Sequence, residues 1–249
     1  MKILIYSDEG ADQSGLLSLH AALKQEQLDQ AYSIESADRA LLRRRGWNRK
    51  TRLLIFPGGR DMPYHRALKG VGNQRIREFV EEGGKFLGIC AGAYYGSASI
   101  QFEPGGSLEV IAARELQFFP GTARGPAYGL GEFRYRSLQG AKMARLHCGS
   151  PSCSAASYYN GGCAFVEPER HEGVGVLARY SDIEGQPAAL VHCPVGEGAA
   201  ILCGVHPEYS AAFPSLQEHL SASLLSALHA IEAERRMLFR LVLQKLGVV

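Results

Sequence analysis

The chain has 249 residues, of which 46% are hydrophobic and 21% charged, and its formal net charge is +2. This length and composition favour a globular protein with a full core and exclude a disordered or fibrous chain. The charge is nearly balanced, and the one arginine run, at 43–45, is short. A nucleic-acid-binding face is therefore not expected.

No apolar run approaches the ~20 residues of a membrane span. The opening "MKILIYSDEG" has too few apolar residues for a signal peptide, so we expect a cytoplasmic protein with no membrane partner. The six cysteines are expected to be free thiols. His and Cys lie close together in 147–153 and in 191–194, but neither segment has paired C-x2-C spacing. The sequence therefore predicts no metal and no cofactor.

The first ninety residues alternate short apolar runs with helical patterns. Residues 2–7, 52–59 and 85–89 contain runs typical of buried strands, whereas 14–25 and 73–84 carry apolar residues at helical spacing. This alternation predicts an α/β fold, with a mainly parallel sheet covered by helices on both faces.

The middle of the chain, 101–170, is rich in Gly, Pro, Ser and aromatic residues. We expect a loop- and hairpin-rich insertion there within a single domain, 1–249, and not a second domain. A long amphipathic C-terminal helix is predicted over 215–246. Three further strands, antiparallel in part, are predicted over 173–180, 188–194 and 198–206.

Cys90 follows the strand predicted at 85–89, with Gly88 two residues before it and Gly92 two residues after it. A residue between strand and helix adopts a strained backbone, and neighbouring glycines let the turn close, as in the G-x-S-x-G elbow of hydrolases. The start of a following helix favours the thiolate, which is the nucleophilic form. By itself, the turn is equally consistent with a buried structural cysteine.

His206 and Glu208 follow another predicted strand, in the stretch "VHPEY". The imidazole of His206 can take the proton of the Cys90 thiol, and the Glu208 carboxylate can orient the imidazole. Because ligands bind at the carboxyl ends of parallel strands, we expect these segments to converge.

A third segment, "FPGG", also ends a predicted strand and contains Gly58 and Gly59. Its backbone N–H groups, together with that of Ala91, are candidates for an oxyanion hole. Without the other two segments, a plain turn would be the preferred interpretation.

The motifs "GICAG", "HPE" and "PGG" together resemble the class I glutamine amidotransferase-like superfamily. Residues 56–97 are most similar to one branch of it, the amidotransferase-like domain at the N-terminus of some biotin protein ligases, which also occurs as a stand-alone bacterial protein. The resemblance extends from Met1 to about Ser210 and implies a flavodoxin-like sheet. It assigns the roles of nucleophile, base and orienting carboxylate to Cys90, His206 and Glu208, and oxyanion N–H groups to Gly58 or Gly59 with Ala91.

The chain departs from this pattern at Tyr94, where glutamine amidotransferases commonly carry Gln, so the resemblance does not identify glutamine as the substrate. It also contains no Gly-Arg-Gly-Arg-type adenylate loop, so biotin ligation by this chain alone is not expected. A separate synthetase or ligase is the partner class that the resemblance suggests.

We therefore expect a thiol-dependent amidotransferase or amidohydrolase that acts on a C–N bond of a small amide. The alternative is a non-catalytic ligand-binding or regulatory module that keeps the same pocket, with Tyr158 near it. For Arg60, Asp61 and Tyr64, which follow the Gly-Gly turn, a local turn with surface salt links is equally consistent. The candidate substrate contacts are Arg60, Asp61, Tyr64, Tyr94, Tyr159 and Asn160.

Overall fold

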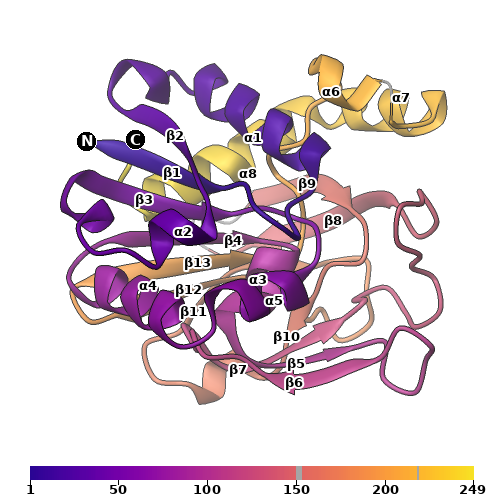
Figure 1. Cartoon of the computed structure of the whole chain (residues 1–249). Coiled ribbons are helices and arrows are strands. Elements are labelled where there is room, and N and C mark those ends of the chain that lie inside the picture. Colours follow the sequence, from indigo (N-terminus) through magenta and orange to yellow (C-terminus); the bar gives the residue numbers. More distant parts are fainter. Residues whose placement is uncertain (150–152, 218) are drawn as a thin grey trace.

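The computed structural model describes residues 1–149, 153–217 and 219–249, and Figure 1 shows how its elements are arranged. Within these residues, thirteen strands form one sheet. The strands are β1 (Lys2–Tyr6), β2 (Ser33–Ala37), β3 (Thr51–Phe56), β4 (Lys85–Ile89), β5 (Ser97–Phe102), β6 (Val110–Ala113), β7 (Phe119–Gly125), β8 (Lys142–Cys148), β9 (Cys153–Tyr159), β10 (Ala164–Phe165), β11 (Gly175–Tyr180), β12 (Ala188–Val195) and β13 (Gly198–Cys203). The α-helices are α1 (Gln13–Gln25), α2 (Arg39–Leu42), α3 (Asp61–Leu68), α4 (Val71–Glu81), α5 (Ala91–Gly96), α6 (Pro214–Gln217), α7 (Ala222–Ala230) and α8 (Glu232–Lys245).

Five strands, in the order β2-β1-β3-β4-β13, form a parallel section of the sheet. Ranked by sequence this order is 2-1-3-4-5, which doubly wound sheets of the flavodoxin type also use. Most of these strands are nearly continuous apolar runs because helices cover both of their faces. The predicted α/β class is confirmed.

Side chains that alternate along each strand pack against different helix layers. Ile3 and Ile5 share a core with apolar residues of α1 and α8, whereas Leu4 and Tyr6 share one with α3, α4 and α5. Figure 1 shows the two helix layers on opposite sides of the parallel strands. The two-residue period of a strand therefore builds two cores.

The other section of the sheet is largely antiparallel. β12 pairs antiparallel with β13, and β10, β7, β5 and β6 extend the sheet beyond it. β11 joins β12 to the hairpin of β8 and β9. The hairpins expected in 101–170 and the partly antiparallel strands after it are confirmed. That region holds more strand than its composition indicated, and its long loop lies between β7 and β8, at 126–141.

The single helix predicted over 215–246 is wrong, because the chain forms α6, α7 and α8 instead. Ser221 begins a new helix, since its side chain accepts a hydrogen bond from the N–H of Leu224. Ile231, with φ −103° and ψ 9°, separates α7 from α8. α8 packs on the sheet through Leu238 and its neighbours, and Leu228 of α7 shares a smaller apolar cluster with Ala156 of β9. One position of the predicted range lies outside the described residues.

Two further findings bear on the environment predicted for the chain. All six cysteines are free thiols, which confirms that prediction. In the described ranges, no helix combines the length and apolar character needed to span a bilayer.

Candidate active site

Three strand ends meet at one edge of the parallel section. β3, β4 and β13 are neighbours that run in the same direction, so their carboxyl ends lie together. Cys90 follows β4, the turn of Gly58 and Gly59 follows β3, and the loop with His206 follows β13. The three segments expected to converge do so.

Cys90 occupies a strained turn between β4 and α5. Its φ of 50° and ψ of −102° lie outside the regions that residues with a side chain ordinarily adopt. The backbone N–H of Cys90 donates to the carbonyl oxygen of Cys203 at 2.8 Å, which ties the turn to the end of β13. A Cβ atom on Gly92 would clash with the backbone of Phe56, and one on Gly88 would clash with Gly92. Both glycines therefore permit a close approach of backbones.

His206 connects Cys90 to a buried carboxylate. Its Nδ1 lies 2.8 Å from Oε1 of Glu208, and His206 lines the same cavity as Cys90. His206 is 5% exposed and Glu208 1%. Burial alone lowers the pKa of His206, but the charges and hydrogen bonds of Glu208 and Cys90 raise that pKa well above its usual value.

Backbone and aromatic neighbours fix the orientation of this imidazole. The backbone N–H of His206 donates to the carbonyl oxygen of Tyr158 at 2.8 Å. The ring centroid of Tyr209 lies 4.7 Å from that of His206, and Tyr209 stacks on Tyr158 at 5.0 Å. On the other side of the site, the Cys90 sulfur lies 3.8 Å from the carbonyl oxygen of Asn160.

The Gly58 turn packs directly on the imidazole. A Cβ atom on Gly58 would lie 2.5 Å from Cε1 of His206, so a side chain there would displace the ring. Gly59 has a φ of 136°, which favours glycine, and the N–H of Asp12 donates to the Gly58 carbonyl oxygen at 3.0 Å. Among the described residues, no backbone carbonyl accepts from the N–H of Gly59 or of Ala91. Both residues line the cavity, so these donors are available there.

A cavity of about 540 Å³ opens beside Cys90, a size typical of small-molecule sites. Gly58 and Glu208 contact His206 but are not among the lining residues. The residues singled out from the sequence that do line the cavity are Gly59, Arg60, Asp61, Cys90, Ala91, Tyr94, Tyr158, Asn160 and His206.

Tyr64 and Tyr159, predicted as substrate contacts, lie in the core instead. The Tyr64 hydroxyl is buried and donates to the carbonyl oxygen of Gly58 at 3.1 Å, so it supports the turn. The Tyr159 hydroxyl donates to the carbonyl oxygen of Gly162 at 3.0 Å. Because side chains alternate along β9, Tyr158 faces the cavity and Tyr159 faces away from it.

Two parts of the site were not predicted from the sequence: Arg114, which supports the cavity wall through Asp61 without lining it, and residues 133–138. Arg114 is 2% exposed, and its Nε donates to Oδ2 of Asp61 at 2.8 Å, so the Asp61 carboxylate has a buried cationic partner. Residues 133–138 of the long loop line the cavity. Arg114 lies 53 positions from its partner in an unremarkable stretch, so no sequence signal pointed to it.

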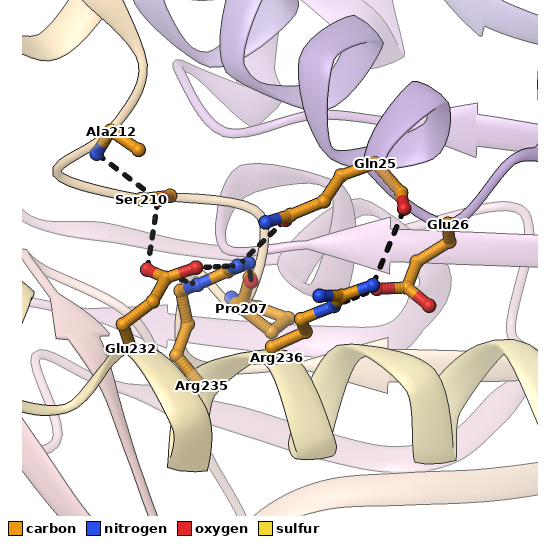
Figure 2. A network of polar contacts seen from close by, with 8 residues as sticks. All are labelled: Gln25, Glu26, Pro207, Ser210, Ala212, Glu232, Arg235 and Arg236. Carbon is orange, nitrogen blue, oxygen red and sulfur yellow. Dashed lines mark hydrogen bonds and ion pairs between the residues drawn. The ribbon is translucent and has the colours of Figure 1, made fainter.

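A buried arginine of α8 anchors the His206 loop, as Figure 2 shows. Arg235 is fully buried, and its guanidinium donates to the carbonyl oxygen of Pro207 at 2.8 Å. The same guanidinium donates to Glu232 at 2.6 Å and to the Gln25 side chain at 3.0 Å. Both α1 and α8 are thus tied to the loop that positions the imidazole.

The described residues contain no group of three or more His, Cys, Asp or Glu side chains that could hold a metal ion. Of the segment 147–153, where His and Cys lie close together in the sequence, residues 150–152 lie outside the described part of the chain.

Comparison with known proteins gives a consistent family. The family model described as "Biotin-protein ligase, N terminal" matches residues 1–249. An uncharacterized protein of Chlamydia muridarum (strain MoPn / Nigg) is 42% identical over 219 residues, which cover 87% of this chain and 84% of that protein. The biotin–protein ligase of Schizosaccharomyces pombe is 38% identical over 216 residues, which cover 85% of this chain but only 34% of the ligase.

Among solved structures, a catalytic mutant of a GH42 beta-galactosidase from G. stearothermophilus is similar in fold. It has a TM-score of 0.50 and 11% sequence identity, and the match covers 99% of this chain and 30% of the galactosidase. This likeness concerns the α/β fold alone.

The elbow glycine at position 92 gives a first test of this geometry. We expect Gly92→Ala to lower the free energy of unfolding by about 1–3 kcal/mol, because the added methyl would press on the Phe56 backbone. Denaturant unfolding measures the change. Gly175→Ala is the control: no heavy atom lies within 4 Å of its Cβ position, so a change within about 0.5 kcal/mol is expected. Equal effects of the two substitutions would contradict the packing argument.

The arginine anchor gives a second test. Arg235→Met leaves the Pro207 carbonyl without this donor, and we expect a loss of about 2 kcal/mol in unfolding free energy. We also expect slower alkylation of Cys90 in the folded chain and a shifted pKa of His206, followed by NMR. The matched control is Arg236→Met on the same helix: its side chain is 45% exposed and Arg240 remains to pair with Glu26, so we expect a loss under about 1 kcal/mol. An unchanged His206 pKa in Arg235→Met would limit Arg235 to a role in stability.

Proposed function

The chain belongs to the family of biotin-protein ligase N-terminal domains, and we propose that it is a thiol-dependent amidohydrolase or amidotransferase of the class I glutamine amidotransferase-like type. Its proposed reaction breaks a C–N bond of a small amide. The observation that carries this proposal is the buried chain of contacts from Glu208 through His206 to Cys90, at the adjoining ends of β13 and β4.

In the proposed reaction the Cys90 thiolate attacks the amide carbonyl carbon, and a C–S bond forms. The resulting oxyanion accepts hydrogen bonds from the N–H groups of Gly59 and Ala91, which line the cavity without a backbone acceptor in the described part of the chain. His206 gives its proton to the leaving nitrogen as the C–N bond breaks. Water, or a second nucleophile, then attacks the thioester, His206 takes up the proton of that nucleophile, and the Cys90 thiolate is regenerated.

Asn160 supports an amide as the substrate class. Its Nδ2 donates to the carbonyl oxygen of Ser137 at 3.1 Å, which orients the carboxamide. Its Oδ1 is buried and has no partner among the described residues, although Asn160 lines the cavity. An amide N–H of a substrate is a suitable donor for this oxygen.

Tyr94 favours a substrate other than glutamine. Its ring is buried in the cavity wall, and its hydroxyl donates to the carbonyl oxygen of Gly161 at 3.1 Å. A tyrosine at this position supplies no carboxamide for pairing with a glutamine side chain, and its hydroxyl already has an acceptor. We further propose that these 249 residues do not ligate biotin alone, because they contain no Gly-Arg-Gly-Arg-type adenylate loop.

Thiol trapping tests the proposal. We expect iodoacetamide to alkylate Cys90 at least about tenfold faster than Cys153, since an adjacent imidazolium favours the thiolate. Cys153 is the sharp comparison because it is more exposed than Cys90, so accessibility alone predicts the reverse order. Peptide mass spectrometry of samples quenched over time measures both rates in one chain. Equal rates, or a faster Cys153, would contradict an activated nucleophile and favour the non-catalytic binding module.

Removal of the carboxylate tests the role of Glu208. Glu208 raises the pKa of His206, so Glu208→Gln lowers it and reduces the imidazolium fraction near neutral pH. We expect Cys90 alkylation there to slow by about tenfold. A rate profile over pH measures this, with thermal unfolding as the control for folding. A profile identical to that of the unmodified chain would remove Glu208 from the mechanism.

A further inference from the structure

The acidic side chains of the cavity already have protein partners. Of the described lining residues, the carboxylates are Asp12 and Asp61. Asp61 forms a buried ion pair with Arg114, so its charge is balanced, and Asp12 caps α1 by accepting from the N–H of Gly15 at 2.8 Å. Among the described lining residues, Asp12 is therefore the one carboxylate without a cationic partner.

The arginines of the cavity are in the opposite situation. Arg60, Arg134 and Arg136 line it and are exposed, so they lie around its opening. None of their side chains forms a hydrogen bond or an ion pair with any residue in 1–149, 153–217 or 219–249. Arg60 follows the Gly-Gly turn, whereas the other two come from the loop at 126–141. Three guanidinium groups from two sides therefore leave the opening with unbalanced positive charge.

Between this opening and Cys90 the wall is aromatic. Phe133 lies edge-on to Phe102 at 5.4 Å and to Tyr135 at 5.0 Å, and Tyr94 lies edge-on to Phe102 at 5.7 Å. Such a wall accommodates an apolar body, while guanidinium groups bind carboxylate or phosphate groups in paired hydrogen bonds.

We propose that the ligand of this cavity is an anionic amide, in which an apolar segment separates the amide carbonyl at Cys90 from a carboxylate or phosphate group held by Arg60, Arg134 and Arg136. This inference rests on the proposed function for the position of the amide. The recognition of the anion stands on the charges alone.

The test compares two probes that differ only in charge, 6-maleimidohexanoate and its methyl ester. We measure the rate of the carboxylate probe at Cys90 relative to the rate of the ester. This ratio is then divided by the same ratio for the urea-unfolded chain. We expect this quotient to be about tenfold above unity at low salt and to fall as salt is added. We expect the quotient to fall to unity in the triple variant Arg60→Gln, Arg134→Gln, Arg136→Gln. Arg66→Gln, an exposed arginine of α3 outside the cavity, is the control and leaves it unchanged.

A quotient that is the same in the unmodified chain and in the triple variant would overturn the inference while leaving an active Cys90 intact. If neither maleimide reacts with Cys90, the proposed function fails, and the anion site is then judged by binding. Calorimetry on the Cys90→Ala chain compares benzoate with benzamide, and about tenfold tighter binding of benzoate, lost in the triple variant, is expected. Equal affinity, or no benzoate binding, would overturn the anion site on its own.

Discussion

The parallel pairing of β13 with β4 is the interaction on which the candidate site depends. In its register Cys203 lies opposite Ile89, so the next residue, Cys90, donates its N–H to the Cys203 carbonyl. This pairing brings Cys90 within reach of His206, although the two lie 116 positions apart in the sequence. A slip by one residue would turn every β13 side chain to the opposite face and would move the His206 loop away from the elbow. Gly198 makes that slip unfavourable, because a side chain at its position would clash with the backbone of Val80 and Gly84.

The contact between the C-terminal helix α8 and the His206 loop is made by a buried charged residue, Arg235, where an apolar residue would be expected. Arg235 is fully buried, and replacement of a buried ion pair by apolar residues is often neutral or stabilising. A contribution to stability therefore does not by itself explain why an arginine occupies this buried position. Its donor to the Pro207 carbonyl has a direction that an apolar side chain cannot supply. Figure 2 shows how this bond and those to Glu232 and Gln25 fix the backbone between the imidazole and its carboxylate. We infer that Arg235 is buried here because its guanidinium orients the His206 loop.

Apolar runs and strand-end positions in the sequence predicted those parts of the molecule that depend on neighbouring residues. The apolar runs at 2–7, 52–59 and 85–89 became buried parallel strands, and the strand-end rule brought Cys90 and His206 together. Features set by tertiary pairing were not predictable. Which of Tyr158 and Tyr159 faces the cavity depends on the register of β9. The small and aromatic residues of this segment show no clear alternation from which the register could be predicted. The pairing of Arg114 with Asp61, and the division of the C-terminal helix, likewise depend on contacts far along the chain.

The unfavourable features of the fold are concentrated where the reactive groups lie. Cys90 has a φ of 50°, and Glu208 is buried with one carboxylate oxygen, Oε2, that has no partner among the described residues. Strain and an unpaired polar atom both destabilise the folded state. A second donor to Glu208 would relieve part of this instability, but it would also disperse the negative charge that acts on His206. The carboxylate raises the pKa of the imidazole strongly because the imidazole is its principal hydrogen-bond partner. The local instability and the shifted pKa of His206 therefore have the same physical origin.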